Sequence, residues 1–176
     1  FDFSKAFDRV DIPTLIRKLR EQGVGGKLLD TIKSMYIGAK SRVEVNGLLS
    51  AEFPVGVGVG QGCVLSPTLF SVYVNDLFTR FREEGLAMEF GDALMAALGF
   101  ADDLVLCGDR KAIEKYIEIL REWCAANNFA VNVKKCAIMP VGFHKKSQDS
   151  HNFVMNGTEI PVVDHFRYLG VTVQAK

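Results

Sequence analysis

The chain has 176 residues, of which 48% are apolar and 24% charged, and this composition excludes a disordered or fibrous protein. Lysine plus arginine equals aspartate plus glutamate at 21 each, so no basic excess is present for a phosphate-rich partner. No apolar run reaches the roughly 20 residues that a membrane-spanning helix needs, and no secretory signal pattern is present. We expect one globular domain over residues 1–176.

The first elements in the chain are a strand and two helices. Residues 1–7 predict a strand that runs into a turn. Asp11 as N-cap and Pro13 in the first turn predict a helix to about Gln22. A second helix is predicted over 27–36, with its apolar stripe formed by Leu28, Leu29, Ile32 and Met35.

A hairpin and a long helix follow. Residues 41–46 alternate in polarity, and Asn46-Gly47 predicts a tight turn into a returning strand over 48–53. Glycine at every second position from 56 to 62 favours a close approach of the backbone to another segment. Ser66 as N-cap and Pro67 as first residue predict a helix to about Glu84, and its broad apolar face should be mostly buried.

The second half mixes hairpins with one more helix. Two apolar runs, 93–100 and 104–107, predict a hairpin with an acidic tip, and Asp109 predicts the cap of a helix over 110–126. The remaining predictions are short strands at 129–133 and 136–139, a polar loop at 144–151, a hairpin over 153–160 around Asn156-Gly157, and a last strand at 166–173. This order predicts an α+β fold, an antiparallel sheet with helices packed on one face.

The cysteines and histidines give no sign of a metal site. None of Cys63, Cys107, Cys124 and Cys136 forms a C-x-x-C pair, and the three histidines do not cluster with them. We expect free buried thiols rather than a zinc site.

Three carboxylates occupy positions that strands disfavour. Asp2 lies at the end of an apolar strand, and Asp102 and Asp103 lie at a hairpin tip between two apolar strands. Adjacent buried carboxylates repel each other, and divalent cations relieve this repulsion. Two such ions about 4 Å apart would suit phosphoryl transfer, with Asp102 as the closer ligand. A solvated turn is the simpler interpretation of an Asp-Asp pair.

Five short blocks occur along the chain: FDFSKAFDRV (1–10), GQGCVLSPTLF (60–70), FADDLVL (100–106), NVKKC (132–136) and YLGV (168–171). In this order they resemble the blocks of non-LTR (LINE-type) retrotransposon reverse transcriptases. The third block resembles the catalytic box of that family, and the last two resemble two later blocks. Together the five blocks span nearly the whole chain.

The resemblance implies a right-hand polymerase palm, with fingers and thumb incomplete in these residues. It implies that Asp2, Asp102 and Asp103 are the catalytic metal ligands for two Mg²⁺ (or Mn²⁺) ions. Phe7 would be an aromatic gate against the ribose 2′-hydroxyl, and Gln61 would contact the incoming nucleotide or template base. Lys135, with Lys134 as the alternative, would lie near the nucleotide phosphates, and the segment 168–170 near the primer grip.

The implied function is RNA-directed DNA polymerase, a nucleotidyltransferase with RNA template, DNA primer and dNTP as partners. The resemblance also implies further fingers, thumb and endonuclease segments of one polyprotein, and without them the isolated 176 residues should be inactive. The expected location is the nucleus or cytoplasm of a eukaryotic host. RNA-templated RNA synthesis and nucleotide cyclisation are alternatives with the same chemistry. Another alternative is a degenerate, inactive copy that only binds nucleic acid. Two features favour it: Gly60 stands where many relatives carry Arg, and the net charge of the chain is zero.

Each substrate-binding residue also has a simpler structural explanation. Phe7 would be a core residue at a strand end, Gln61 a turn residue, and the Lys134-Lys135 pair a solvated loop. Tyr168 would be ordinary strand packing. Asp8 would cap or close the turn after Phe7 and is given no metal role.

Overall fold

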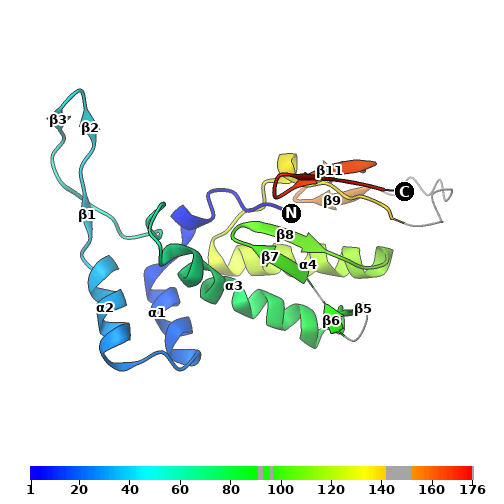
Figure 1. Ribbon diagram of the computed structural model, residues 1–176, viewed down its shortest axis with the longest axis horizontal. Coiled ribbons are helices and arrows are strands. Elements are labelled where there is room, and N and C mark those ends of the chain that lie inside the picture. Colours follow the sequence, from blue (N-terminus) through cyan, green and yellow to red (C-terminus); the bar gives the residue numbers. More distant parts are fainter. Residues whose placement is uncertain (91–92, 96, 142–151, 176) are drawn as a thin grey trace. The chain divides into compact units, whose positions relative to one another are not determined.

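Figure 1 shows the computed structural model, which describes residues 1–90, 93–95, 97–141 and 152–175. The chain divides into two compact units, one formed by Phe1–Ser4 with Arg80–Lys176 and the other by Lys5–Thr79. The prediction of one domain is not tested by this division, because one domain can contain two compact units. The polar loop predicted at 144–151 lies outside the described residues.

The unit Lys5–Thr79 contains a short 3₁₀ helix, two complete α-helices, a long hairpin and most of a third α-helix. Its elements are η1 (Phe7–Arg9), α1 (Ile12–Glu21), α2 (Gly26–Tyr36), β1 (Lys40–Ser41), β2 (Glu44–Val45), β3 (Leu48–Leu49), β4 (Phe53–Pro54) and the first part of α3 (Ser66–Glu83).

Both predicted helices of this unit are confirmed, but the apolar stripe of the second is only half correct. The Asp11 carboxylate accepts a hydrogen bond from the Thr14 amide at 2.9 Å and caps α1. On α2, Leu29 and Ile32 are buried, whereas Leu28 is 60% exposed and Met35 45% exposed. Hydrophobic periodicity alone therefore overestimated the buried face of α2.

The hairpin after α2 follows the predicted turn. Asn46 and Gly47 both have positive φ, at 50° and 79°, and Val45 pairs with Leu48 across the turn. Farther from the turn, Ser41 pairs with Phe53. All four short strands are exposed on both faces, and Figure 1 shows the hairpin extending away from α1 and α2.

A buried lysine joins α1 to α3. Lys18 is only 5% exposed, and its Nζ donates to the carbonyl oxygen of Tyr73 at 2.6 Å and lies 2.8 Å from Asp76 Oδ2. The same nitrogen lies 4.4 Å from the centre of the Tyr73 ring. Burial lowers the pKa of Lys18, while the Asp76 carboxylate acts to raise it. The charge is tolerated in the interior because each side of the ammonium meets an electron-rich group.

The glycine-rich stretch meets another segment closely, as the sequence predicts. The Gly58 amide donates to the carbonyl of Val10 at 2.8 Å, and the Val59 amide donates to that of Phe7 at 2.9 Å. Gly58 has φ +93°, and a Cβ there would lie 3.1 Å from the Cα of Asp8. Only glycine satisfies both the backbone angle and the close approach.

Among its described residues, the other unit contains the end of α3, three complete hairpins, a further short strand pair and one long helix. Its elements are β5 (Met88–Phe90), β6 (Ala93–Met95), β7 (Ala97–Phe100), β8 (Asp103–Leu106), α4 (Arg110–Asn127), η2 (Val133–Lys135), β9 (Phe153–Met155), β10 (Thr158–Ile160), β11 (His165–Tyr168) and β12 (Val171–Gln174).

Several predicted strands in this unit are wrong in extent. The run 93–100 contains two strands, β6 and β7, which pair with β5 and β8 respectively. The predicted last strand over 166–173 is the hairpin β11–β12, because Leu169 and Gly170 both adopt positive φ. Leu-Gly is a weak turn signal, so sequence patterning does not show this turn.

The short strands predicted at the N-terminus and around residue 134 are also shorter than expected. Within 1–7 only Asp2 and Phe3 make strand bridges, and Phe7 begins the 3₁₀ helix η1 instead of ending a strand. In 129–139 only Val131 and Ile138 make bridges, and Val133–Lys135 is a 3₁₀ helix.

Helix α4 is capped as predicted and packs through aromatic side chains. The Asp109 carboxylate accepts a hydrogen bond from the Ala112 amide at 2.9 Å. The Trp123 ring lies 5.8 Å from that of Phe3, so α4 covers the N-terminal segment. Tyr116 packs edge-on against Phe81 at 4.8 Å, and burial raises the pKa of Tyr116 to about 12.

The coarse fold class is confirmed as mixed helix and antiparallel strand pairs, compatible with α+β. Each strand pair among the described residues is antiparallel and two-stranded. Cys124 and Cys136 are buried, as expected, whereas Cys63 is half-buried and Cys107 exposed, because Cys107 follows the last strand residue of a hairpin. None of the helices in the described part of the chain is long and apolar enough to cross a membrane.

The close approach at Gly58 generates a stability prediction. We expect Gly58→Ala to destabilise the 176-residue chain by about 1–3 kcal/mol, because Ala at positive φ is strained and its Cβ meets the Asp8 backbone. Chemical denaturation monitored by circular dichroism measures this change.

Gly56→Ala is the matched control, since Gly56 has an ordinary φ and nothing lies within 4 Å of an added Cβ. It should leave stability unchanged or slightly raised. Equal losses in both variants would contradict the assignment.

Candidate functional site

The N-terminal segment lies between two other segments of its unit. Phe1 exchanges two backbone hydrogen bonds with Leu104, at 2.7 and 2.8 Å, which attaches the segment to β8. On the other side, the Asn132 amide donates to the carbonyl of Asp2 and the Ser4 amide to that of Ala130, both at 2.8 Å. The hairpin β7–β8, the N-terminal segment and residues 130–132 therefore lie side by side.

This pairing places Asp2 opposite Asp103. The two residues form an antiparallel bridge next to the hydrogen-bonded pair of Phe1 and Leu104, so they occupy a non-hydrogen-bonded position. At such positions the Cα atoms are about 4.5 Å apart and the side chains project from the same face. Two carboxylates from distant parts of the sequence are thus brought together.

Asp102 lies in the two-residue turn between β7 and β8. Ala101, the other turn residue, has φ +53°, and Asp103 is the first residue of β8, opposite Phe100. Asp102 is the predicted closer metal ligand, whereas the strand register puts Asp103 directly opposite Asp2. Burial, then the charges of Asp102 and Asp2, raise the pKa of Asp103.

Asp2 has one paired and one unpaired oxygen. Lys135, from η2, places its Nζ 3.3 Å from Asp2 Oδ2, and the lysine side chain is 65% exposed. The other oxygen, Oδ1, is buried and has no hydrogen-bond partner among the described residues. An unpaired buried carboxylate oxygen is costly, so this site favours a cation.

The acidic residues fit a divalent cation by their chemistry. Carboxylate oxygens are the ligands that Mg²⁺ prefers, and two of them face the same side of the strands here. Over residues 1–90, 93–95, 97–141 and 152–175, no group of three His, Cys, Asp or Glu side chains is arranged to hold an ion. Any ion bound at Asp2 and Asp103 would therefore need further oxygens from water or substrate phosphates.

The two predicted substrate-binding residues of the other unit also lie close together. Phe7 is half-buried and stacks on Phe70, with ring centres 5.1 Å apart and planes 23° apart. Gln61 is exposed and its Nε2 donates to Asp8 Oδ1 at 3.0 Å. The structure thus groups Asp2, Asp103 and Lys135 in one unit, and Phe7 and Gln61 in the other.

For Asp8 and Tyr168 the structure shows surroundings that the sequence did not predict. Asp8, interpreted as a turn residue, accepts the Gln61 hydrogen bond. Tyr168, interpreted as strand packing or part of a primer grip, ends β11, and burial and the charge of Asp103 raise its pKa. Sequence patterning gave no signal for the hydrogen bond to Asp8 or for the influence of Asp103 on Tyr168, because both depend on tertiary structure.

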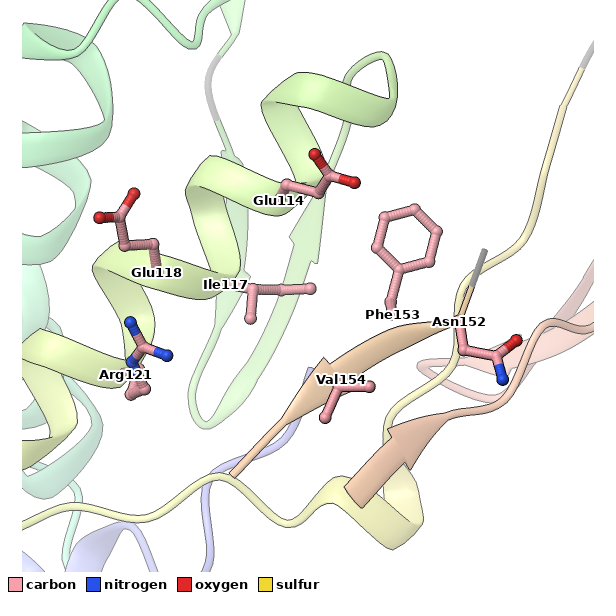
Figure 2. A pocket seen from close by; sticks show the side chains of 7 residues that line it. All are labelled: Glu114, Ile117, Glu118, Arg121, Asn152, Phe153 and Val154. Atoms are coloured by element: carbon pink, nitrogen blue, oxygen red, sulfur yellow. The ribbon is translucent and has the colours of Figure 1, made fainter. Parts of the chain in front are cut away.

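A cavity at the surface lies away from these residues. It has a volume of about 210 Å³, is open to solvent and lies between α4 and β9. Figure 2 shows its lining side chains, among them Glu114, Glu118 and Phe153. None of the predicted site residues lines it.

Comparisons with known proteins agree with the resemblance seen in the sequence. Residues 1–173 match the family model described as reverse transcriptase (RNA-dependent DNA polymerase). The chain is 32% identical, over 97% of its length, to the RNA-directed DNA polymerase from mobile element jockey of Drosophila funebris. It is 30% identical, over 97% of its length, to a Pol polyprotein from a type-1 retrotransposable element R2 of Popillia japonica. It is also 30% identical, over 99% of its length, to the transposon TX1 149 kDa protein of Xenopus laevis.

The chain covers only 19% of the jockey protein, 30% of the R2 polyprotein and 13% of the TX1 protein. The predicted resemblance to non-LTR retrotransposon proteins is confirmed by these relatives. With the family model matching nearly the whole chain, this protein belongs to the reverse transcriptase (RNA-dependent DNA polymerase) family.

Proposed function

We propose that this chain forms the palm of an RNA-directed DNA polymerase, which adds dNTPs to a primer 3′-hydroxyl along an RNA template. The observation that carries the proposal is the bridge between Asp2 and Asp103, beside a turn that contains Asp102. The partners would be RNA template, DNA primer, dNTP and the remaining segments of a longer polyprotein. The relatives, of which the chain covers a minority, support this context.

The acidic residues would hold the divalent ions on which this chemistry depends. Two Mg²⁺ (or Mn²⁺) ions would activate the primer hydroxyl and neutralise charge on the transferred phosphate. Asp2 and Asp103 present carboxylates on one face, and Asp102 extends the negative charge at the turn. Lys135 neutralises Asp2 Oδ2 and, on a flexible exposed side chain, can turn toward a nucleotide phosphate.

Phe7 and Gln61, both in the unit Lys5–Thr79, would contact the nucleotide. The Phe7 ring is held by stacking on Phe70, which is fully buried, so it cannot swing away freely. A fixed ring beside the sugar would collide with a 2′-hydroxyl and select deoxynucleotides. Gln61 would contact the nucleotide or the template base.

Removing one carboxylate charge tests the catalytic role. We expect Asp102→Asn in the full-length protein to reduce nucleotide incorporation by on the order of a thousandfold or more, because phosphoryl transfer depends on charge neutralisation. Primer extension on an RNA template with a DNA primer measures the loss.

Asp109→Asn is the control, since Asn and Asp are equally good N-cap residues and the Asp109 carboxylate caps α4 by accepting a hydrogen bond from the Ala112 amide. It should retain normal incorporation. Full activity in Asp102→Asn would contradict the proposal, and no incorporation by the unmutated protein would favour a degenerate, binding-only copy.

The gate is tested by shortening Phe7. We expect Phe7→Val to raise NTP use relative to dNTP by about tenfold or more, since the steric barrier to the 2′-hydroxyl is removed. Comparing kcat/KM for dNTP and NTP measures this ratio. Phe7→Tyr keeps the ring and should keep the preference for dNTP, whereas a preference for NTP in the unmutated enzyme would overturn the gate.

The raised pKa of Asp103 predicts how pH and metal affect stability. A raised pKa in the folded state means that the folded protein binds the proton more tightly, so stability falls as pH rises through that pKa. At pH 7 without divalent ions, Asp103→Asn should therefore melt at a higher temperature than the unmutated chain. This advantage should disappear below the ordinary pKa of 3.8.

Added Mg²⁺ should reverse the order, because it stabilises the chain only where the carboxylate remains. Thermal melting of both proteins with and without Mg²⁺ measures the effect. An equal Mg²⁺ shift in both proteins would show that Asp103 binds no metal.

A further inference from the structure

We infer that Asp8 is a positioning residue that fixes the orientation of the Gln61 side-chain amide at the nucleotide site. This inference rests on the proposed function and adds to it a residue with no metal role. It begins from one contact, in which Gln61 Nε2 donates to Asp8 Oδ1 at 3.0 Å.

The chemistry of the two groups fixes the orientation of the amide. An ionised carboxylate has no proton to donate, so only the nitrogen end of an amide can face it. The Gln61 oxygen, Oε1, is then turned away from Asp8. Both side chains are exposed, so packing does not fix this orientation and the carboxylate has to do so.

The backbone holds the two residues at a fixed separation. Asp8 lies in η1, and the stretch before Gln61 is attached to the same segment by the hydrogen bonds of Gly58 to Val10 and of Val59 to Phe7. Gly58 brings this stretch within contact distance of the Asp8 backbone. The hydrogen bond between side chains therefore joins two segments that are already docked, and little entropy is lost in forming it.

The arrangement predicts what Gln61 recognises. An acceptor oxygen beside a negative carboxylate suits a hydrogen-bond donor and repels a phosphate. The donor is the sugar 3′-hydroxyl of the incoming nucleotide or an amino group of the template base. Asp8 would thus direct Gln61 to the sugar or base and away from the triphosphate.

Substitution of Asp8 in the full-length protein tests the inference. We expect Asp8→Ala to raise KM for dNTP about fivefold with little change in kcat, because the amide loses its charged partner and rotates freely. Asp8→Glu keeps a carboxylate and should restore most of the affinity. Asp30→Ala, which removes another exposed carboxylate of the same unit, should change neither constant.

A double-mutant cycle separates positioning from a structural role. In a Gln61→Ala background, Asp8→Ala should have no further effect on KM, because its action passes through Gln61. An unchanged KM in Asp8→Ala, or additive effects in the double variant, would overturn the inference while leaving the proposed function intact. Failure of the unmutated protein to incorporate dNTP would overturn both.

Two substrates distinguish the source of the donor. If the donor is the sugar 3′-hydroxyl, KM for a 2′,3′-dideoxynucleotide should not respond to Asp8→Ala. If it is the template base amine, the response should persist with dideoxynucleotides and disappear when template guanosine is replaced by inosine. Either pattern supports the inference, and a response that is the same for all of these substrates and templates contradicts it.

Discussion

The backbone pairing of residues 1–4 is the constraint on which the acidic site depends. Hydrogen bonds to β8 on one side and to residues 130–132 on the other fix the register of this segment within a single residue. A shift of one residue would turn the Asp2 side chain to the opposite face. The two carboxylates can share a face only because this register is fixed from both sides.

The buried groups around this segment explain why the register holds. Phe3 projects to the face opposite Asp2 and packs against Trp123 and Phe129, at ring distances of 5.8 and 5.7 Å. Moving Phe3 out of this aromatic cluster would expose its ring, which is only 6% accessible. Burial of one side chain on one face therefore positions the carboxylate on the other, since alternate residues of a strand point in opposite directions.

Some elements of the fold could be predicted from the sequence and others could not. The helices with Asp caps and the turns with Asn-Gly were predictable, since a side chain that accepts an amide proton or a residue that tolerates positive φ acts locally. Strand lengths were not, because they depend on which segments meet. The run 166–173 is the clearest example, because it was predicted as one strand but turns at Leu169-Gly170 and pairs with itself as β11 and β12.

The same division applies to the candidate site. Asp2, Asp102 and Asp103 could be selected from the sequence because carboxylates are out of place beside apolar strands. That Asp103 rather than Asp102 lies opposite Asp2, and that Asp8 holds Gln61, depends on register and loop docking. Neither the Asp2–Asp103 pairing nor the Asp8–Gln61 hydrogen bond can be predicted from the residues that neighbour each other in the sequence.

The grouping of Asp2, Asp102 and Asp103 is electrostatically unfavourable when no cation is bound. Asp103 has a raised pKa, and a buried oxygen of Asp2 lacks a partner, so replacement of either residue by a neutral one should stabilise the metal-free chain. A chain that only bound nucleic acid would gain from losing these carboxylates, since they also repel phosphates. All three remain in this sequence, beside a lysine that can neutralise only one of the oxygens. The proposed metal-dependent catalysis would explain why such a costly arrangement is present.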